Sequence, residues 1–432
     1  MRIAVIGAGI SGIAAAWALS DRYHVTLYEA APVLGGHSRT LTVDVGEHEV
    51  AVDTGFIVYN ERNYPQLVQL FSALGVESYD SDMSFSVTDH ADGFSFAGSP
   101  RGLFPSTPSL VDRRRWAILR GILAFRAERQ RLVDGDVADD QAIGRYLVER
   151  GYPAPFIDDY LIPLATAVWS GTRNSAENMS ARNFLAFLDN HGLIGLDDRP
   201  RWRTVRGGAI AYVERAAKEI TSVRVATPVT AVERSRAGVV VTSEGQKESF
   251  DVVVFATHAD VTLRILGTAA SRQERTALGA FRYERNEVVL HSDPSPMPAD
   301  RRRWASWNAI RCDSGHRPVG VTYWMNRLQD LSTDIDLFVS LNAGHLLDDD
   351  RVLDRWSTMH PQFDGCTNDA QAAIGRLQGL NRTWYAGAYL GYGFHEDGAR
   401  SGFDVARALG SPPYWSGSST GRAVGASRGS QR

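Results

Sequence analysis

The sequence predicts an α/β protein in which a domain built on a parallel sheet is interrupted by a second domain of helices and antiparallel strands. Three observations predict it. Residues 2–6 form a β-branched apolar run that leads into a glycine-rich loop and an alanine-rich helical pattern. Residues 251–258 form a second apolar run, which is typical of a buried parallel strand. A mostly helical stretch at residues 61–200 separates the two, so the first domain is left and later resumed.

The composition is that of an ordinary globular protein long enough for two domains. The chain has 432 residues, of which 44% are hydrophobic and 22% are charged. Its net charge of −4 argues against general nucleic-acid binding. No apolar run reaches the roughly 18 residues that a membrane-spanning helix needs. Cys312 and Cys366 have neither metal nor disulfide spacing, and the first strand follows Met1 directly, so we expect a cytoplasmic protein without a metal or a signal peptide.

The glycine-rich loop at residues 7–12 has the sequence of a dinucleotide-binding turn. Gly7 permits the tight turn, Gly9 lets the backbone approach a pyrophosphate, and Gly12 lets helix and strand pack closely. The helix that follows offers free N–H groups and a positive dipole end to phosphates. A second predicted strand ends at Glu29, which is placed to accept hydrogen bonds from a ribose hydroxyl. The first domain is therefore predicted to be Rossmann-like.

A second glycine pair, Gly35 and Gly36, comes soon after the acid. A plain NAD dehydrogenase has no need of this pair, whereas a chain that turns back over a longer diphosphate does. His37, Arg39 and Thr40 offer hydrogen-bond donors next to it.

Residues 41–52 alternate as a β-hairpin and lead into residues 53–60. Gly55 would allow a flat ring to approach the backbone, and Phe56, Ile57 and Tyr59 could wall it. A strand that simply ends in a turn explains the same pattern equally well, so both interpretations stay open.

The helical stretch contains one long pattern at residues 107–133 in which apolar residues interleave with arginines. Such a helix can lie on an anionic membrane surface, or it can be a solvated helix of a domain that caps the substrate. Helices are also expected at residues 141–150, 156–169 and 180–190, with a kink at Pro163. Trp169 is a candidate for lining a pocket.

The resumed part begins with Gly207 and Gly208 ahead of a helix at residues 211–220. The strands expected after it are at residues 222–226, 229–234, 238–242, 248–250, 286–291, 319–324, 338–342 and 382–387. The last helix is expected at residues 399–409. The tail at residues 411–432 is rich in Ser, Gly, Pro and Arg and is expected to be disordered. The predicted first domain is residues 1–60, 201–285 and 380–410, and the predicted second domain is residues 61–200 and 286–379.

Together these motifs resemble the amine-oxidase and phytoene-desaturase group of FAD flavoproteins, whose FAD-binding domain is of the glutathione-reductase type. The segments that carry the resemblance are residues 7–12, Glu29, 35–36, 53–55, 207–208, 255–257 and 386–387. Residues 55–60 and 255–260 resemble a narrower bacterial family described as predicted NAD/FAD-binding proteins. Its genes often accompany cyclopropane-fatty-acid-synthase-like methyltransferases, which implies work on lipid acyl chains and a lipid methyltransferase as a partner.

The resemblance implies non-covalent FAD, with its adenosine ribose at Glu29, its adenine at Val229 and its pyrimidine end by the last helix. The implied cofactor contacts are Gly7, Gly9, Ile10, Ser11, Gly12, Glu29, Gly35, Gly36, His37, Arg39, Thr40, Thr54, Gly55, Phe56, Ile57, Val229, Ala256, Gly387, Ala388, Phe394 and His395.

This chain departs from the group at three positions. His37 stands where an arginine is common, and Ala388 stands where an acid that binds the ribityl chain is common. Most amine oxidases also carry a lysine near flavin N5, in a strand of the substrate domain. Residues 286–291 contain none, because the two lysines of the chain are Lys218 and Lys247. Amine oxidation is therefore disfavoured.

The resemblance and these departures lead to three functional hypotheses. The first is hydride transfer to flavin N5 from an apolar substrate such as a fatty acyl chain, giving desaturation, oxidation or double-bond isomerisation. The second is amine oxidation, and the third is a non-catalytic FAD-binding partner of a lipid methyltransferase. No catalytic residue is fixed, and the pocket candidates are Tyr59, Trp169, His258 and His395. An enzyme of acyl chains would also be expected at the inner face of the membrane.

Overall fold

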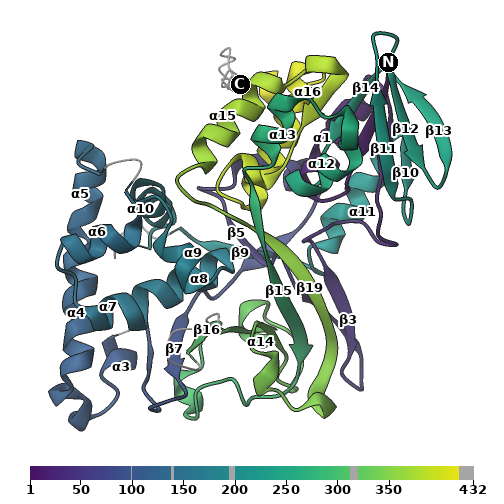
Figure 1. Cartoon of the computed structure of the whole chain (residues 1–432). Coiled ribbons are helices and arrows are strands. Elements are labelled where there is room, and N and C mark those ends of the chain that lie inside the picture. Colours follow the sequence, from purple (N-terminus) through teal and green to yellow (C-terminus); the bar gives the residue numbers. More distant parts are fainter. Residues whose placement is uncertain (99, 138–140, 194–199, 312–319, 418–432) are drawn as a thin grey trace, which may run out of the picture.

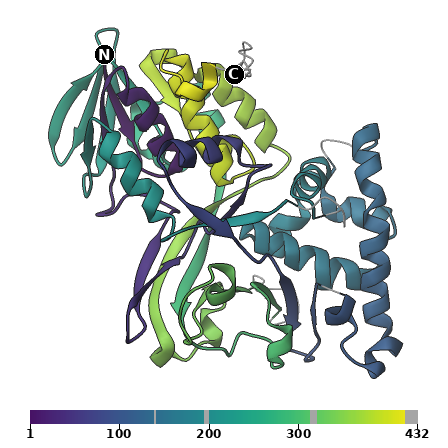
Figure 2. The same ribbon diagram turned by 180° about the vertical axis from the view of Figure 1, so that it is seen from behind.

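The computed structural model describes residues 1–98, 100–137, 141–193, 200–311 and 320–417. Within these residues two large sheets dominate, one of five and one of seven strands (Figure 1). The five-stranded sheet lies at the end of the molecule that holds the N-terminus. Two long strands of the seven-stranded sheet connect it to the rest, and most helices of residues 100–190 gather on one side (Figures 1 and 2).

The five-stranded sheet is wholly parallel, as the sequence predicts. Its strand order is β10 (Ser222–Arg224), β2 (His24–Tyr28), β1 (Arg2–Ile6), β14 (Val252–Phe255) and β20 (Thr383–Tyr385). The neighbouring strands β1 and β14 are buried on both faces, which explains their unbroken apolar sequences. Because these strands come from three distant parts of the chain, the sheet is assembled from discontinuous segments.

The side chains of β1 alternate between two cores. Ile3 and Val5 pack on the side of α1 (Ile10–Ser20) and α16 (His395–Ala408). Ala4 and Ile6 pack on the opposite side, against an antiparallel sheet. That sheet consists of β11 (Val229–Arg234), β12 (Val239–Ser243) and β13 (Gln246–Phe250), and it is backed by α12 (Ala259–Leu266), α13 (Arg272–Leu278) and α15 (Thr367–Leu377).

The seven-stranded sheet is the main sheet of the second part of the molecule (Figure 1). Its order is β19 (Val352–Gln362), β15 (Arg282–His291), β18 (Phe338–Leu341), β17 (Gly320–Trp324), β16 (Trp307–Arg311), β7 (Phe85–Asp89) and β8 (Ser95–Ala97). All neighbours are antiparallel except β7 and β16, which are parallel, so the predicted antiparallel sheet is mixed at one pair.

Two smaller sheets link the parts. The predicted hairpin is formed by β3 (Thr40–Asp44) and β4 (Glu49–Asp53), and β5 (Val58–Asn60), β9 (Trp202–Val205) and β6 (Ser78–Asp80) make a short antiparallel sheet. The helix α11 (Ile210–Glu219) follows β9, and α2 (Pro65–Ala73) follows β5.

The helical part confirms most of the predicted helices. It contains α3 (Pro100–Leu103), α4 (Arg113–Phe125), α5 (Ala127–Asp134), α6 (Ile143–Glu149), α7 (Ala154–Phe156), α8 (Ile162–Trp169), α9 (Arg173–Glu177) and α10 (Ala181–Asn190). The Ser180 side chain caps α10 by accepting from the Asn183 N–H. A π-helical turn at Ile157–Leu161 precedes Pro163, where the sequence predicts a kink.

Two predicted helices have different limits in the structure. The pattern at residues 107–133 is a 3₁₀ turn at Thr107–Val111 followed by α4 and α5, because Asp112 is extended and caps α4 by accepting from the Arg114 N–H. The last helix begins at His395 rather than residue 399. Asp397 accepts from the N–H groups of Tyr392 and Phe394, which closes the first turn earlier.

The beginning of the predicted disordered tail is ordered. Ser411 is buried, and Trp415 stacks on Trp17 at 5.7 Å between ring centroids. The prediction is therefore wrong for residues 411–417, whereas residues 418–432, Cys312 and Val319 lie outside the described residues. No helix in the described ranges combines the length and the apolarity needed to cross a bilayer.

Candidate functional site

The glycine loop after β1 is tightly packed except at one point. Gly7 has φ +99°, and a Cβ on Gly12 would lie 1.8 Å from the Gly7 carbonyl oxygen. A Cβ on Gly9, in contrast, would meet no protein atom within 4 Å. Gly7 and Gly12 are thus required by the fold itself, while Gly9 faces open space at the start of α1.

The second glycine pair lies directly on the first loop. The Gly35 N–H donates to the Ala8 carbonyl oxygen at 2.9 Å, and Gly9 and Gly35 form an isolated parallel bridge. A Cβ on Gly36 would lie 3.1 Å from the Gly9 Cα, yet Gly36 is exposed. The two motifs therefore border the same open space.

Glu29 stands at the end of β2 with its carboxylate held by the backbone. Its two oxygens accept from the N–H groups of Ala8 (2.8 Å) and Ala31 (2.9 Å). The Thr227 N–H donates to the Glu29 carbonyl oxygen at 2.8 Å, which brings the start of β11, and with it Val229, to this end of the site. The fixed carboxylate retains lone pairs for a ribose hydroxyl.

Residues 37–39, which follow the second glycine pair, lie in close contact with residues 54–56. The Phe56 N–H donates to the His37 carbonyl oxygen at 2.8 Å, and a Cβ on Gly55 would lie 2.1 Å from that oxygen. Thr54 bonds the Arg39 carbonyl oxygen through both its N–H and its hydroxyl. The close approach of the two segments explains Gly55.

The N-terminus of α16 lies beside that of α1. A Cβ on Gly398 would be 2.6 Å from Ile10 Cγ2 and 3.0 Å from Ser11 Oγ, so the two helices pack in close contact. The Gly387 N–H donates to Ser401 Oγ at 2.9 Å, which fixes Gly387 and the following Ala388 against this helix. Two positive helix ends therefore face one region.

These observations fit FAD. A Cβ at Gly9 would meet no protein atom within 4 Å, and Gly36 and Gly55 are exposed, so the backbone is accessible where the diphosphate and the flat ring would lie. Half-buried residues line the same region: Glu29, His37, Ala256, Ala388, Phe394 and His395. Glu29 would hold the adenosine ribose, the two glycine segments the diphosphate, and residues 55–57 with the start of α16 the ring.

Two predicted donors point elsewhere. The Arg39 guanidinium pairs with Asp354 at 2.7 Å and lies over the Trp356 ring at 4.0 Å, so it is engaged by β19. Thr40 donates to Asp53 at 2.6 Å, next to Gly208. Both side chains are thus held by protein partners, while Arg39 Nη1 is buried without a hydrogen-bond partner in the described residues.

Asp53 ties three segments together in the core. It accepts from Thr40, from the Ala209 N–H (2.8 Å) and from Gln329 Nε2 (2.9 Å). Burial raises its pKa to about 7, although these hydrogen bonds act in the opposite direction. Gly208 packs against this network, which makes the pair Gly207 and Gly208 a packing feature rather than a contact to a nucleotide.

His395 lies in a small network at the start of α16. Its Nε2 is 2.7 Å from Ser38 Oγ and 3.1 Å from the Tyr212 hydroxyl, and its ring stacks on Phe56 at 3.8 Å. Burial, together with the nearby His37, lowers the pKa of His395 to about 3. The imidazole is therefore neutral near pH 7.

Three further histidines meet where the two sheets approach each other. The His37 ring centroid lies 5.9 Å from that of His258 and 5.2 Å from that of His360. Thr358 Oγ1 is 2.9 Å from His37 Nε2. The Asn286 amide donates to His360 Nδ1 at 2.8 Å, which leaves the ring proton of neutral His360 on Nε2.

These imidazoles are also neutral near pH 7. Burial and the neighbouring His258 lower the pKa of His37 to about 4. Burial, with His37 and His258, lowers the pKa of His360 to about 3, and burial lowers that of His258. Nowhere in the described part of the chain do three or more His, Cys, Asp or Glu side chains form a group suited to a metal ion.

Replacing His360 by glutamine is expected to flatten the dependence of stability on pH. The pKa of His360 is lower in the folded protein than the usual 6.5, so the unfolded chain binds more protons between pH 6.5 and about 3. Stability therefore falls as the pH falls through that window. At about pH 5 the loss reaches about 2 kcal/mol for a fully buried ring and less for this half-buried one.

Thermal unfolding of the parent, His360→Gln and His24→Gln between about pH 8 and about pH 5 measures this effect. His24 is exposed, so its variant should follow the parent. Burial raises the pKa values of Asp53 and Glu396 to about 7, so these two groups make stability rise as the pH falls. Their contribution is the same in every variant. A His360→Gln curve parallel to that of the parent would show that the ring is not held neutral.

An aromatic cluster separates the helical part from the start of α16. Phe187 stacks on Phe394 at 4.6 Å with 16° between the planes, and on His191 at 3.9 Å. Trp169 lies 4.6 Å from Phe187 and 5.5 Å from Phe184. The predicted pocket residue Trp169 and the predicted cofactor residue Phe394 thus belong to one apolar wall.

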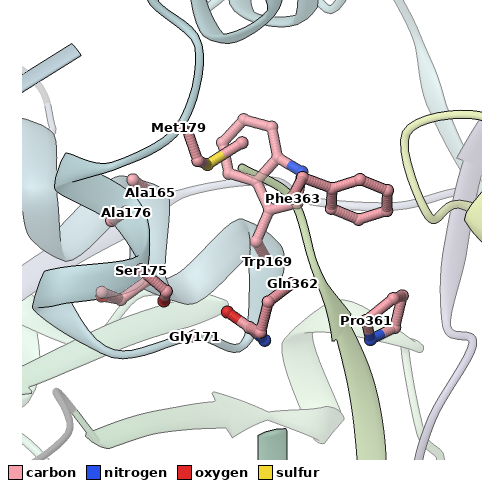
Figure 3. A pocket seen from close by; sticks show the side chains of 10 residues that line it. Ala165, Trp169, Gly171, Ser175, Ala176, Met179, Pro361, Gln362 and Phe363 are labelled. Carbon is pink, nitrogen blue, oxygen red and sulfur yellow. The ribbon is translucent and has the colours of Figure 1, made fainter. Parts of the chain in front are cut away.

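Trp169 also lines a small pocket between α8, α9 and the end of β19 (Figure 3). Met179 and Phe363 lie on either side of the indole, and Gln362 and Ser175 are polar residues of the same lining (Figure 3). The Trp169 Nε1 is buried without a hydrogen-bond partner in the described part of the structure. The lining of this pocket is mainly apolar, and its unpaired N–H group is buried.

Tyr59 does not join this wall. Its hydroxyl donates to Ser78 Oγ at 2.7 Å, and its ring packs against Phe71 and Tyr64 in the core. The second interpretation of residues 53–60, a strand ending in the core, describes Tyr59 better than a pocket role. Ile57 is likewise buried, and its carbonyl oxygen accepts from the Thr204 hydroxyl.

Most of the residues that the sequence did not single out near the glycine loops come from β15 and β19. Asn286, Thr358 and His360 complete the histidine cluster, and Asp354 and Trp356 hold Arg39. Every second residue of β19 from Asp354 to His360 faces these loops. The burial of β19 alternates with a period of two, but its sequence does not alternate between apolar and polar residues, so no sequence signal marked them.

Comparison with known proteins agrees with this arrangement. A sequence model of a family described as flavin containing amine oxidoreductase matches residues 10–295. Among solved structures, the CLA-producing fatty acid isomerase from P. acnes is similar with a TM-score of 0.69 and 15% identity, over 94% of this chain and 98% of that chain. Putrescine oxidase with bound putrescine is similar with a TM-score of 0.68 and 15% identity, over 95% of this chain and 99% of that chain.

Cyclohexylamine oxidase from Brevibacterium oxydans IH-35A is also similar, with a TM-score of 0.66 and 18% identity over 94% of this chain and 98% of that chain. At such identities the structural likeness shows the fold alone. The family match spans more than half of the sequence, and the glycine loops, Glu29 and the paired helix ends fit the cofactor. The chain belongs to the flavin containing amine oxidoreductase family and is an FAD-dependent oxidoreductase.

Proposed function

We propose that this oxidoreductase acts on the acyl chain of a fatty acid or lipid. The observation that carries the proposal is the neutrality of the side chains that meet opposite the glycine loops. They are imidazoles with lowered pKa, the Asn286 amide and the Thr358 hydroxyl, next to an aromatic wall. A site of this kind matches an uncharged hydrocarbon better than a cation.

The absence of lysine in this region supports the same substrate class. Asn286 occupies β15, the strand of the second sheet that approaches the glycine loops, and it hydrogen-bonds His360 and Asn342. Lys218 is exposed on α11, and Lys247 pairs with Glu233 on an outer hairpin. Neither lysine reaches the histidine cluster, so the chain lacks the group that most amine oxidases place near flavin N5.

The aromatic wall does not have the form of a cage for an amine. A cage needs two facing rings with room for the substrate nitrogen between them. Phe187 and Phe394 are in direct contact, with 4.6 Å between their centroids. A chain of methylene groups can lie along such a stacked pair, because it needs apolar contact on one side only.

The residues of the chain have a supporting role in the chemistry. FAD, when bound, supplies the acceptor for the hydride that leaves the substrate carbon. His37, His258 and His360 are neutral and add no charge to the region. The Asn286 amide keeps the ring proton of His360 on Nε2, where it can be shared with a neighbouring acceptor. His395 remains neutral next to Ser38 and Tyr212.

Similar folds support the proposal at the level of architecture. One of the similar structures is described as a fatty acid isomerase, so this fold can accommodate chemistry on an acyl chain. Others are described as oxidases of putrescine and cyclohexylamine. The fold therefore permits both substrate classes, and the side chains described above favour the first.

Anaerobic mixing of the FAD-loaded protein with an unsaturated fatty acid is expected to bleach the visible flavin absorbance, or to produce a positional isomer without net bleaching. Putrescine and cyclohexylamine are expected to leave the spectrum unchanged. Bleaching by the amines but not by the fatty acid would make the protein an amine oxidase. If no compound changes the spectrum and no product forms, a non-catalytic FAD-binding partner of a lipid methyltransferase becomes the better account.

A further inference from the structure

The outer surface of α4 combines exposed apolar side chains with arginines. Trp116 and Leu123 are 44% and 50% exposed on this helix, and Leu110 and Val111 in the preceding turn are 51% and 83% exposed. Large apolar side chains this exposed are unusual when they gather on one element. Both views place α4 on the outer edge of the helical part (Figures 1 and 2), and its inner side packs against β7 and β8 of the seven-stranded sheet.

The exposed residues of α4 form a single stripe. Arg113, Trp116, Arg120 and Leu123 are exposed, and they are spaced by three, four and three residues, which places them on one face of the helix. Ala124, which is also exposed, follows Leu123. The opposite face is committed to the interior.

The inward face holds α4 firmly in the protein. Ile118 and Phe125 are buried, and a Cβ on Gly121 would collide with the Phe156 side chain. Arg114 pairs with Asp159, and Arg115 donates to the Leu103 carbonyl oxygen and pairs with Asp112. The outer stripe is therefore fixed in orientation, and its side chains are not part of the core.

The charge of this surface has one sign. Between residues 105 and 127, all of which are described, none of the exposed side chains is acidic. Asp112 is the single acid in that range, and it is half-buried as the cap of α4. A protein with 50 acidic residues and a net charge of −4 thus has an arginine-bearing apolar segment without an exposed acid at residues 105–127. The exposed Asp92, from outside this range, is paired with Arg114.

We propose that the docking stripe, defined as Leu110, Val111, Arg113, Trp116, Arg120 and Leu123, binds the surface of an anionic phospholipid bilayer. The apolar side chains enter the boundary between head groups and acyl chains, and the two arginines pair with lipid phosphates. Trp116 is suited to this depth, because its ring is apolar and its Nε1 is already satisfied by the Leu110 carbonyl oxygen at 2.7 Å. This docking does not depend on which substrate the flavin site accepts.

Co-sedimentation of the FAD-loaded, full-length protein with vesicles tests the proposal. We expect binding to vesicles of phosphatidylcholine with phosphatidylglycerol and much weaker binding to phosphatidylcholine alone. Raising the salt from about 0.1 M to about 1 M should weaken the binding, since the Debye length falls from about 10 Å to about 3 Å. Equal binding to both kinds of vesicle, or no binding at the lower salt, would overturn the proposal.

Two double variants separate the charged and the apolar contributions. Arg113→Gln with Arg120→Gln should weaken binding to the anionic vesicles by about 30-fold, which corresponds to about 1 kcal/mol for each arginine. Val111→Ser with Leu123→Ser should weaken it by at least about tenfold.

Matched controls lie elsewhere on the surface. Val33 and Leu380 are 62% and 51% exposed, and the side chains of Arg206 and Arg264 are 64% and 71% exposed, all outside the stripe. The corresponding serine and glutamine double variants should bind like the parent. Full binding by the stripe variants, or equal losses in the controls, would overturn the proposal. If the parent is a dimer in sedimentation velocity and the Val111→Ser with Leu123→Ser variant is a monomer, the stripe mediates self-association and the proposal is overturned.

Discussion

Gly9→Ala is expected to lose FAD while keeping its fold. The new Cβ would meet no protein atom within 4 Å, and Gly9 has an ordinary φ of −71°, so an alanine there is tolerated by the apoprotein. The methyl group would instead occupy the space that the diphosphate needs next to the start of α1. We expect FAD affinity to fall by roughly tenfold to hundredfold, as for an overpacked interior worth about 1–3 kcal/mol.

Gly12→Ala provides the contrasting case for this measurement. Its Cβ would lie 1.8 Å from the Gly7 carbonyl oxygen, so the loop and α1 must separate. This variant is expected to unfold at a lower temperature even without cofactor. Titration of both apoproteins with FAD, together with their melting temperatures, distinguishes the two effects. If Gly9→Ala binds FAD as tightly as the parent, the open space at Gly9 is not the diphosphate site.

Glu274→Gln is expected to destabilise the protein by about 3–5 kcal/mol. Glu274 is buried on α13 and accepts from Arg234 on β11 (3.0 Å), Tyr385 on β20 (2.5 Å) and its own capping residue Ser271 (2.6 Å). Burial acts to raise its pKa, but these hydrogen bonds outweigh it and lower the pKa to about 2. The glutamine would leave the Arg234 charge buried without its partner.

Glu233→Gln is the matched control for that variant. Glu233 lies next to Arg234 in β11, but its pair with Lys247 is exposed, with 63% and 61% of the side chains accessible. Exposed pairs contribute at most about 1 kcal/mol. Chemical unfolding of both variants at neutral pH checks the difference. A loss for Glu274→Gln no larger than that for Glu233→Gln would contradict the role assigned to this buried pair.

The parallel sheet and its glycine motifs were predictable because local chemistry determines them. The run at residues 2–6, the spacing of Gly7, Gly9 and Gly12, and the position of Glu29 need one arrangement of strand, turn and helix. The convergence of Gly35 and Gly36 on that loop is also found in the structure. These residues act mainly through their backbone, which the sequence pattern specifies directly.

The strand β19 escaped prediction because its two faces are similar in polarity. Its inward residues include Asp354, Trp356, Thr358 and His360, and its outward residues include Leu353, Arg355 and Met359. A strand is recognised by alternation between apolar and polar side chains. Here the inward face carries polar groups that serve Arg39 and the histidine cluster, so the usual contrast is absent.

The side chains of the site were less predictable than its backbone. Arg39 and Thr40 stand next to the second glycine pair in sequence, but distant residues, Asp354 and Asp53, bind them instead. His37 and His258 were singled out separately, and only the fold shows that they meet His360. Contacts between distant segments depend on tertiary packing, which a local pattern does not contain.

The most direct test of the central claim is to incubate a di-unsaturated fatty acid with the FAD-loaded protein and air, and to analyse it by chromatography that separates double-bond isomers, followed by mass spectrometry. We predict an acyl chain that has either lost two hydrogens or kept its mass with a shifted double bond. Recovery of the unaltered fatty acid, in a preparation that converts putrescine or cyclohexylamine to its oxidised product, would contradict the account.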